Sequence, residues 1–176
     1  MRKLSMDELN RPSVEAFKNT KKNPFILLLD NVRSAHNVGS AFRTADAFAV
    51  EKIMLCGITA TPPNREIAKT ALGATESIAW EYSETSEEAV KRLRDEGYLI
   101  VILEQTEGSI NLNHFTISSD KKYCFVFGNE VFGVDEKLLP LADVSVEIPQ
   151  FGTKHSLNIS VSVGIVLWEC SRQLLF

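Results

Sequence analysis

Four short apolar runs recur along the chain, each with the length of a buried strand. They are residues 25–29 (FILLL), 52–56 (KIMLC), 98–103 (YLIVIL) and 123–127 (YCFVF). Nearly unbroken apolar runs of this length, with β-branched or aromatic side chains, are typical of strands that are covered on both faces. We therefore predict four buried strands.

Segments with helical spacing lie between and before these runs. Residues 37–49 and 84–96 repeat apolar side chains every three or four positions, and Gly97 ends the second segment. Residues 5–17 are predicted to form a polar helix, in which Pro12 must occupy a turn or the first helical position. Strands that alternate with helices predict an α/β fold, with a mostly parallel sheet flanked by helices. With no repeat or linker in the sequence, residues 1–176 are expected to form a single domain.

Residues 156–176 fit two patterns. The stretch SLNISVSV alternates apolar and polar residues as a strand does, whereas Leu157, Val161, Gly164 or Ile165, and Trp168 follow helical spacing equally well. An unbroken run of about 17 or more residues favours a helix, because strands are shorter. Its apolar side chains cover more than one face, so this helix should be buried on several sides, as a dimer interface would allow.

Composition places the chain among ordinary globular proteins. Its 176 residues are 44% hydrophobic and 24% charged, enough for one core without disulfides or metals. No stretch approaches the roughly 20 apolar residues that span a bilayer, and the N-terminus lacks the apolar centre of a signal peptide. Because Cys56, Cys124 and Cys170 show no CxxC spacing, we interpret them as core residues in a reducing cytoplasm, not as a metal site.

The charge balance does not by itself indicate a nucleic-acid partner. The formal net charge is −4, yet the first 43 residues hold eight Lys or Arg against four Asp or Glu, and the remainder holds eleven against nineteen. The amino-terminal part can therefore present a basic surface to RNA. On composition alone, the alternative that these lysines and arginines are merely solvated is equally good.

A polar loop follows the first predicted strand and leads into a helix that starts near Asn37. Residues 29–44 read LDNVRSAHNVGSAFRT. Open α/β sheets bind ligands at the carboxyl ends of parallel strands, and a helix N-terminus offers free N–H groups to an anion. Arg43 adds a positive charge suited to phosphate. Taken alone, the segment is explained better by Asn37 as a helix cap and Arg43 as a surface residue.

Two further loops follow predicted strands. Residues 128–135, GNEVFGVD, come directly after YCFVF, and their two glycines permit a tight backbone near a ligand. Residues 148–160, IPQFGTKHSLNIS, begin where a strand ends at Pro149, turn on Gly152 and lead to a helix with Ser156 as N-cap. Each loop alone also fits a purely structural role, with Asp135 capping the first helix and Asn158 lying on the surface of the second.

Together and in this order, the three segments resemble the SpoU (TrmH-like) branch of the SPOUT RNA methyltransferases. The residues that match its three motifs are Asn37, Gly39 and Arg43, then Gly128, Asn129 and Glu130, then Ile148, Pro149, Ser156, Leu157 and Asn158. Residues 69–74, KTALGA, are also similar to a stretch common in the family. The resemblance extends from about residue 25 to the C-terminus.

The resemblance implies a C-terminal trefoil knot within the α/β fold, which is a rare exception to the rule against threaded chains. It also implies a homodimer and S-adenosylmethionine as cofactor, held in the knot largely by backbone groups. The residues implied to line the cofactor site are Leu103, Gly128, Ile148, Ser156 and Leu157. The lack of a GxGxxG fingerprint agrees with such a site, because that motif marks an ordinary dinucleotide-binding fold.

The implied reaction is methyl transfer to the 2′-hydroxyl of a ribose in RNA. Because that hydroxyl is a weak nucleophile, the site must align it and stabilise negative charge on its oxygen. Arg43 is the first candidate for this role. Since arginine stays protonated in proteins, we expect it to fix a neighbouring phosphate rather than to act as a base.

Other motif residues have implied supporting roles. Asn37 and Asn158 would position the substrate or Arg43, and Ser156 would organise the knot loop. Glu130 would hold Arg43 or the loop geometry, and its use as a general base is the weaker alternative. His36 and His155 flank the motifs without belonging to them, so neither is expected to be catalytic.

RNA contacts are expected from basic residues near these motifs. Arg33, Arg43 and Arg65 are candidates, together with Lys18, Lys21 and Lys22 of an N-terminal extension over residues 1–22, which could contact phosphates. The additional N-terminal RNA-binding domain of many rRNA-acting relatives is not found here, which favours tRNA over rRNA. Two other functions remain as alternatives: a catalytically silent knotted RNA-binding module, and an α/β enzyme acting on a small molecule.

Overall fold

The computed structural model describes residues 1–5 and 7–175, and in this part of the chain a seven-stranded parallel sheet forms the centre. Its strand order is β3-β2-β1-β6-β4-β7-β5. The strands are β1 (Asn23–Asp30), β2 (Val50–Cys56), β3 (Ala79–Ser83), β4 (Tyr98–Leu103), β5 (Ile110–Asn111), β6 (Lys122–Phe127) and β7 (Val144–Glu147). The four predicted strands are therefore confirmed, and so is the α/β fold with a parallel sheet.

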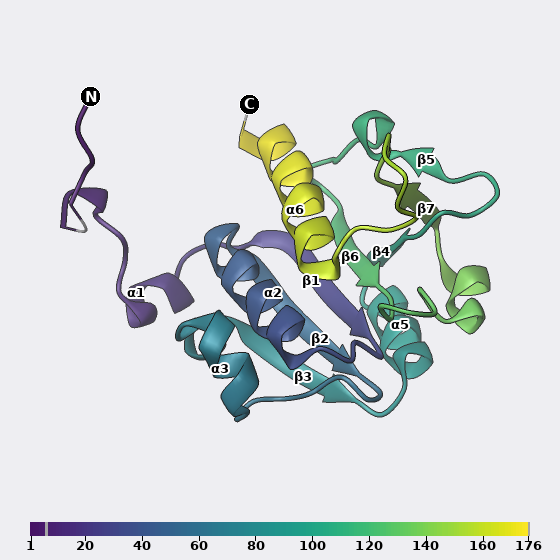
Figure 1. The fold of residues 1–176 in the computed structure, drawn as a ribbon, viewed down its shortest axis with the longest axis horizontal. Coiled ribbons are helices and arrows are strands. Elements are labelled where there is room, and N and C mark those ends of the chain that lie inside the picture. The colour runs from purple at the N-terminus through teal and green to yellow at the C-terminus, as the bar shows by residue number, and fades with distance from the viewer. Residues whose placement is uncertain (6, 176) are drawn as a thin grey trace.

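Helices cover both faces of the sheet (Figure 1). On one face lie α2 (Ala35–Ala47), α3 (Arg65–Ala71), α4 (Ala74–Ser77) and α6 (Ile159–Leu175). On the other face lie α5 (Ser86–Asp95) and the 3₁₀ helix η3 (Glu136–Leu141). The remaining short helices are η1 (Asp7–Leu9), α1 (Val14–Lys18) and η2 (Leu112–His114).

The packing of strand β1 explains why its central sequence is continuously apolar. Phe25, Leu27 and Leu29 pack into the hydrophobic cluster under α2 and α6. Ile26 and Leu28, which point to the opposite face because side chains alternate along a strand, pack into the cluster under α5 and η3. Both faces of this stretch are fully buried, which explains why each of the positions 25–29 is apolar.

The order of the strands reverses direction at β1. The chain runs outward from β1 to β2 and β3, and the later strands β6, β4, β7 and β5 lie on the other side of β1. In an open α/β sheet, the carboxyl ends of strands beside such a switch point form a crevice that binds ligands. The loops after β1, β6, β4 and β7 all leave from this edge.

The C-terminal segment is a helix, as its length predicts, but it begins later than expected. Ser156 does not cap it. Instead, the Asn158 side-chain oxygen accepts a bond from the Ser160 N–H at 2.8 Å, and the Asn158 carbonyl accepts bonds from the N–H groups of Val161 and Ser162. The loop from β7 carries the chain back past β4 and β6, so that α6 packs beside α2.

Other predicted boundaries also shift. The expected helix over residues 5–17 is wrong, because η1 and α1 are separate, Pro12 lies between them and Ser13 caps α1; residue 6 lies outside the described part. Helix α2 begins at Ala35, since Ser34 rather than Asn37 is its N-cap. Strand β7 ends at Glu147, before the predicted end at Pro149. The short elements β3, β5, α3 and α4 were not predicted.

The cysteines are core residues, as expected. Cys56, Cys124 and Cys170 are free and buried. Burial raises the pKa of the Cys56 and Cys170 thiols to about 12 and also raises that of Cys124. Among the described residues, no helix is long and apolar enough to cross a membrane.

Candidate active site

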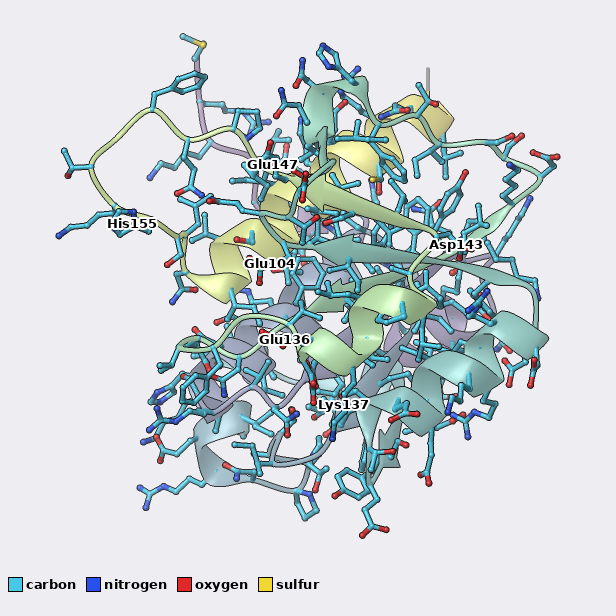
Figure 2. All side chains as sticks on the ribbon, turned by 90° about the vertical axis from the view of Figure 1, so that its right-hand side faces the viewer. Glu104, Glu136, Lys137, Asp143, Glu147 and His155 are labelled. Atoms are coloured by element: carbon cyan, nitrogen blue, oxygen red, sulfur yellow. The ribbon has the colours of Figure 1, made fainter. Side chains whose placement is uncertain are left out.

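A cavity of about 590 Å³ opens at the carboxyl ends of β6, β4 and β7. Its walls combine apolar side chains with amides, carboxylates and exposed backbone. The residues that line it are Leu103, Glu104, Gln105, Phe127, Gly128, Asn129, Glu130, Val131, Phe132, Gly133, Val146, Glu147, Ile148, Gln150, His155, Ser156, Leu157, Asn158, Ile159 and Ser162. Figure 2 labels three of these lining residues: Glu104 after β4, Glu147 at the end of β7 and His155 on the following loop.

The loop after β6 folds tightly against the cavity. Asn129 and Gly133 exchange two backbone hydrogen bonds of 2.8 and 2.9 Å, which close a short turn. A Cβ on Gly128 would lie 2.2 Å from the carbonyl carbon of Gly133 and from the nitrogen of Val134, so only glycine fits there. Gly133 has a φ of +72°, which a side chain would strain.

Glu130 connects this loop to the loop after β1. Its carboxylate accepts the backbone N–H of Arg33 at 2.9 Å, that of Ser34 at 3.1 Å and the side-chain amide of Asn37 at 2.9 Å. Partial desolvation acts to raise the pKa of Glu130, but these hydrogen bonds to the charged form outweigh it and lower the pKa below its ordinary value. Glu130 is therefore an ionised clamp, and its predicted role in holding loop geometry fits these contacts.

Asn37 connects the pair of loops to the third motif. Its side-chain oxygen accepts a hydrogen bond from the Asn158 amide at 3.2 Å, while its amide group donates to Glu130. Asn158 in turn begins α6. The three sequence motifs thus meet in one hydrogen-bonded chain from Glu130 through Asn37 to Asn158, at the edge of the cavity.

The five residues proposed to line a cofactor site all border this one cavity. They are Leu103, Gly128, Ile148, Ser156 and Leu157. Three come from the ends of β4, β6 and β7 or the positions just after them, and two come from the loop before α6. The parallel sheet brings them together because these strands end at the same edge.

Arg43 occupies a different place from the other motif residues. It is exposed on α2, six positions beyond Asn37, and it does not belong to the cavity lining. No ion pair or side-chain hydrogen bond of Arg43 occurs within residues 1–5 and 7–175, so the suggested link from Glu130 or from the two asparagines to Arg43 is absent there.

The candidate RNA-binding residues divide into two groups. Arg33 and Arg65 are exposed, and neither guanidinium forms an ion pair within the described part of the chain. By contrast, Lys18 lies 3.5 Å from Glu15, and the Lys22 ammonium donates to the Phe17 carbonyl and lies 3.4 Å from the centre of the Phe17 ring.

Lys21 is exposed beside this turn. Of the six candidates, the three arginines and Lys21 form no ion pair within the described part of the chain, whereas Lys18 and Lys22 contact residues of the chain's own N-terminal turn.

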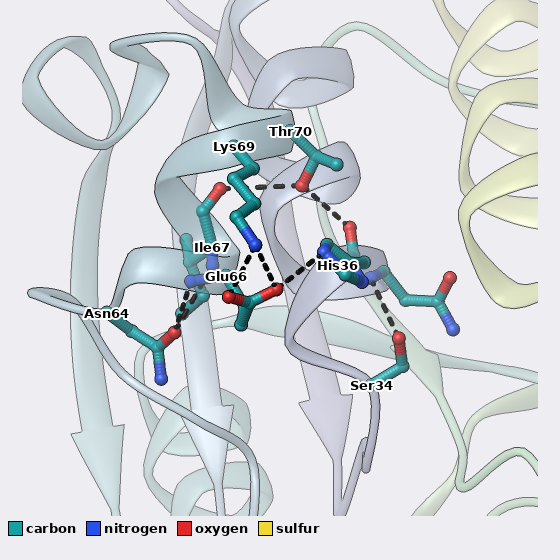
Figure 3. Close-up of polar contacts among 8 residues, drawn as sticks. Ser34, His36, Asn64, Glu66, Ile67, Lys69 and Thr70 are labelled. Carbon is teal, nitrogen blue, oxygen red and sulfur yellow. Dashed lines mark hydrogen bonds and ion pairs between the residues drawn. The ribbon is translucent and has the colours of Figure 1, made fainter.

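The histidines next to the motifs have structural contacts. The His36 ring lies 2.9 Å from a Glu66 oxygen, and Lys69 contacts the same carboxylate (Figure 3). Thr70 donates to the His36 carbonyl at 2.9 Å, which fixes α3 against the start of α2. The His155 carbonyl accepts a hydrogen bond from the Gln105 side-chain amide at 3.3 Å, and His155 lines the cavity.

Gly39 is part of the same packing between α2 and α3. A Cβ there would lie 2.3 Å from the Ile67 carbonyl oxygen. Its match to the family motif therefore has a steric reason: the two helices approach too closely for a side chain.

Two carboxylates that the sequence analysis did not single out also shape the site. Asp30, buried at the end of β1, accepts bonds from the Ser86 hydroxyl at 2.5 Å and from the Asp135 N–H at 2.8 Å. Glu104 accepts the N–H groups of Val134 at 3.1 Å and Gln105 at 3.0 Å. Each follows or ends a buried apolar run, and that position was the available signal.

Among the described residues, no group of three or more His, Cys, Asp or Glu side chains is arranged to hold a metal ion.

Comparison with known proteins adds independent information. Residues 24–168 match the model of the SpoU rRNA Methylase family. The chain is 31% identical over 159 residues to a 23S rRNA (guanosine-2′-O-)-methyltransferase of Neisseria meningitidis, covering 90% of this chain but 62% of that protein. It is 31% identical over 157 residues to a tRNA (guanosine(18)-2′-O)-methyltransferase of Aquifex aeolicus, covering 87% and 71%.

A solved structure agrees with these matches. The fold superposes with a TM-score of 0.81 on an AdoMet-bound rRNA methyltransferase from Sinorhizobium meliloti, at 28% identity, covering 91% of this chain and 60% of that one. The chain thus spans about three fifths of the length of some of the proteins that it matches.

Proposed function

The chain belongs to the SpoU rRNA methylase family, and we propose that it transfers a methyl group from S-adenosylmethionine to the ribose 2′-hydroxyl of an RNA nucleotide. The observation that carries this proposal is the hydrogen-bonded chain from Glu130 through Asn37 to Asn158, beside the cavity at the sheet edge. These hydrogen bonds bring residues of all three family motifs to one place. Residues that only capped a helix or formed a surface loop would not need to meet in this way.

The cavity suits the proposed cofactor in size and chemistry. Its volume of about 590 Å³ falls within the range of roughly 300–1,000 Å³ typical of small-molecule sites. Leu103, Ile148 and Leu157 supply apolar contact for an adenine ring, and the tight turn at Gly128 brings backbone groups close to the cavity. When bound, S-adenosylmethionine supplies an electrophilic methyl group on a positively charged sulfur.

Arg43 is proposed to act on the RNA from outside the cavity. Its exposed guanidinium can bind the phosphate next to the reacting ribose with two parallel hydrogen bonds. That contact fixes the 2′-oxygen and stabilises the negative charge that develops on it as the oxygen attacks the methyl carbon. The proton of the hydroxyl leaves to a phosphate oxygen or to water, because the arginine itself stays protonated.

Glu130 is not proposed as the base. Its two oxygens already accept three N–H groups, and its lowered pKa makes it a poorer proton acceptor. Its proposed part is to hold the loop after β1 and Asn37 in place. Asn37 and Asn158 then position the substrate, and Ser156 organises the loop that lines the cavity.

A homodimer is proposed from the surface of α6. Val161, Ile165 and Trp168 are 49, 37 and 55% exposed, and their spacing places them along one stripe of the helix. The opposite side of α6 is fully buried against the sheet at Val163, Val166 and Leu167. A second copy that covers the exposed stripe would complete the burial. We also propose that the loop between β7 and α6 forms the trefoil knot of the family.

We propose that the RNA substrate is tRNA and that the enzyme acts in the cytoplasm. The exposed guanidinium groups of Arg33 and Arg65 are available to phosphates of the RNA. One of the similar proteins is named as a tRNA methyltransferase. Another similar protein is named as a 23S rRNA methyltransferase, and that similarity makes rRNA the second candidate substrate.

The test is transfer of a labelled methyl group from S-adenosylmethionine to unmodified tRNA and rRNA, followed by nucleoside analysis. A 2′-O-methylated nucleotide in tRNA supports the full proposal. Product in rRNA alone would move the substrate to the second candidate. No product in either RNA, from folded protein that binds the cofactor, would favour a silent RNA-binding module or a small-molecule enzyme.

A further inference from the structure

The most exposed feature of the loop after β6 is an aromatic ring. Phe132 is 84% exposed, although it lines the rim of the cavity, and Val131 beside it is 62% exposed. Exposed large apolar groups at the mouth of a binding site often mark a surface that a partner covers.

The backbone that presents this ring is held rigidly. The Asn129 side-chain oxygen accepts the N–H of Val131 at 2.8 Å and that of Phe132 at 3.2 Å. The Asn129 amide group donates to the Asn31 carbonyl at 2.8 Å, which anchors the turn to the loop after β1. The backbone of Phe132 is thus fixed while its ring faces solvent, so little backbone freedom is lost when a ligand packs on the ring.

The surroundings of Phe132 indicate the kind of ligand. Glu130, two positions earlier, holds the backbone of Arg33, and the Arg33 guanidinium is exposed and forms no ion pair with any described residue. An apolar ring that lines the cavity and an exposed guanidinium therefore lie on adjoining loops, which Glu130 connects. A nucleotide carries the matching pair of groups, a flat base and a negatively charged phosphate.

We propose that Phe132 stacks on a base of single-stranded RNA, that of the nucleotide whose ribose enters the cavity. This inference rests on the proposed methyl transfer, because the reacting ribose must reach the cavity and its own base then lies at the rim. Proteins that read unpaired RNA commonly stack bases on aromatic side chains. Phe132 would contribute affinity and orientation for any base, since every base offers a π-face.

The test compares four variants on RNA with and without the base. Phe132→Ala should raise KM for RNA by roughly tenfold, since a base–aromatic stack contributes about that much, with little change in kcat. Phe132→Tyr and Phe132→Trp should restore KM, whereas Phe132→Leu should not, because it keeps apolar area without a ring. On RNA with an abasic site at the methylated nucleotide, binding by Phe132→Ala and by the wild type should be equal.

Several outcomes would overturn the inference. An unchanged KM in Phe132→Ala would do so, as would an equal loss on the abasic RNA or full rescue by leucine. A shift of Phe132→Ala toward monomer in sedimentation equilibrium would assign the ring to a subunit contact instead. Failure of the wild type to methylate any RNA would count against the proposed function, whereas an active wild type with an indifferent Phe132 would reject only the stack.

Discussion

The Asn158 amide donates a hydrogen bond of 3.2 Å to the Asn37 side-chain oxygen, although the two residues are 121 positions apart. Asn158 also caps α6 through its side-chain oxygen, which accepts the Ser160 N–H. One side chain therefore both starts the C-terminal helix and connects it to the loop after β1. The two contacts use different atoms, so they can be removed separately.

Replacement of Asn158 should separate its two roles. Asn158→Ala loses the cap and should lower the free energy of unfolding by about 1 kcal/mol, measured by urea denaturation. Asn158→Asp keeps the accepting oxygen and should retain most of that stability. Because Asn158→Asp lacks the amide donor to Asn37, we expect this variant to methylate RNA more slowly than wild type despite its stability. Equal activity of Asn158→Asp and wild type would show that the bond to Asn37 has no role in the reaction.

Arg43 should affect the chemical step and not the cofactor. Arg43→Ala is expected to lower kcat by about 10²–10³-fold, the usual effect of removing a group that stabilises an oxyanion. S-adenosylmethionine binding, measured by calorimetry, should stay within about twofold of wild type, since Arg43 lies outside the cavity lining. Arg43→Lys keeps the charge but loses the two parallel bonds, so it should recover activity only in part. Lost cofactor binding in Arg43→Ala would place the residue in the pocket.

The stability of the protein should depend on the ionisation of Glu130 at acid pH. Its pKa is lower in the folded protein than its ordinary value of 4.5. Its contribution is therefore fully present above the ordinary value and is lost as the pH falls through the lower folded value. Glu130→Gln removes this contribution, so the difference in unfolding free energy from wild type should shrink as the pH drops below about 4.5.

The control for that titration is Glu136→Gln on η3, an exposed carboxylate with no side-chain hydrogen bond within the described part of the chain. Glu136→Gln should change the unfolding free energy little, because it removes no such hydrogen bonds. A Glu130→Gln difference that grows toward acid pH would contradict the assignment of Glu130 as an ionised clamp.

Gly128 should tolerate no side chain. Gly128→Ala places a Cβ 2.2 Å from backbone atoms of Gly133 and Val134, and backbone cannot rotate away as a flexible side chain can. The turn must shift, at a cost of about 1–3 kcal/mol in unfolding free energy. Cofactor affinity should fall as well, because the turn forms one wall of the cavity.

The matched control is Gly152→Ala, where a Cβ meets no atom within 4 Å. It should change the unfolding free energy and the cofactor affinity little. Normal cofactor affinity in a folded Gly128→Ala variant would argue against the cavity as the cofactor site.

A charged side chain introduced into the exposed apolar stripe of α6 should dissociate the proposed homodimer into monomers. Ile165→Glu would place a carboxylate within an apolar contact, where burial without a partner is costly. Sedimentation equilibrium should then show monomer, with wild type as dimer. Ile58→Glu, on an equally apolar but separate surface position that is 67% exposed, should leave the dimer intact. A wild type that sediments as monomer would reject the proposed homodimer.

The buried strands were predictable because of how they are packed. Strand β1 and its neighbours β2 and β6 are covered on both faces, and this leaves an unbroken apolar signature in the sequence. Edge strand β3 has no fully buried residue, and β5 is two residues long, so neither leaves such a signature. Length alone resolved the C-terminal segment as a helix.

The three motifs named the residues of the site but not their contacts. The sequence determined the α/β class, the buried strands and the residue types at the ends of those strands. Only the tertiary structure decided that Glu130 binds Arg33, Ser34 and Asn37 instead of Arg43, that Asn158 and not Ser156 begins α6, and that Phe132 faces solvent.

The physical reason is the range of these interactions. Burial and helix formation leave local periodicities in a sequence, whereas the bonds from Glu130 join residues 93 to 97 positions apart. Those partners meet because β6 lies beside β1, and Asn158 meets Asn37 because the chain returns from β7 to pack α6 on α2. No local pattern encodes that strand order.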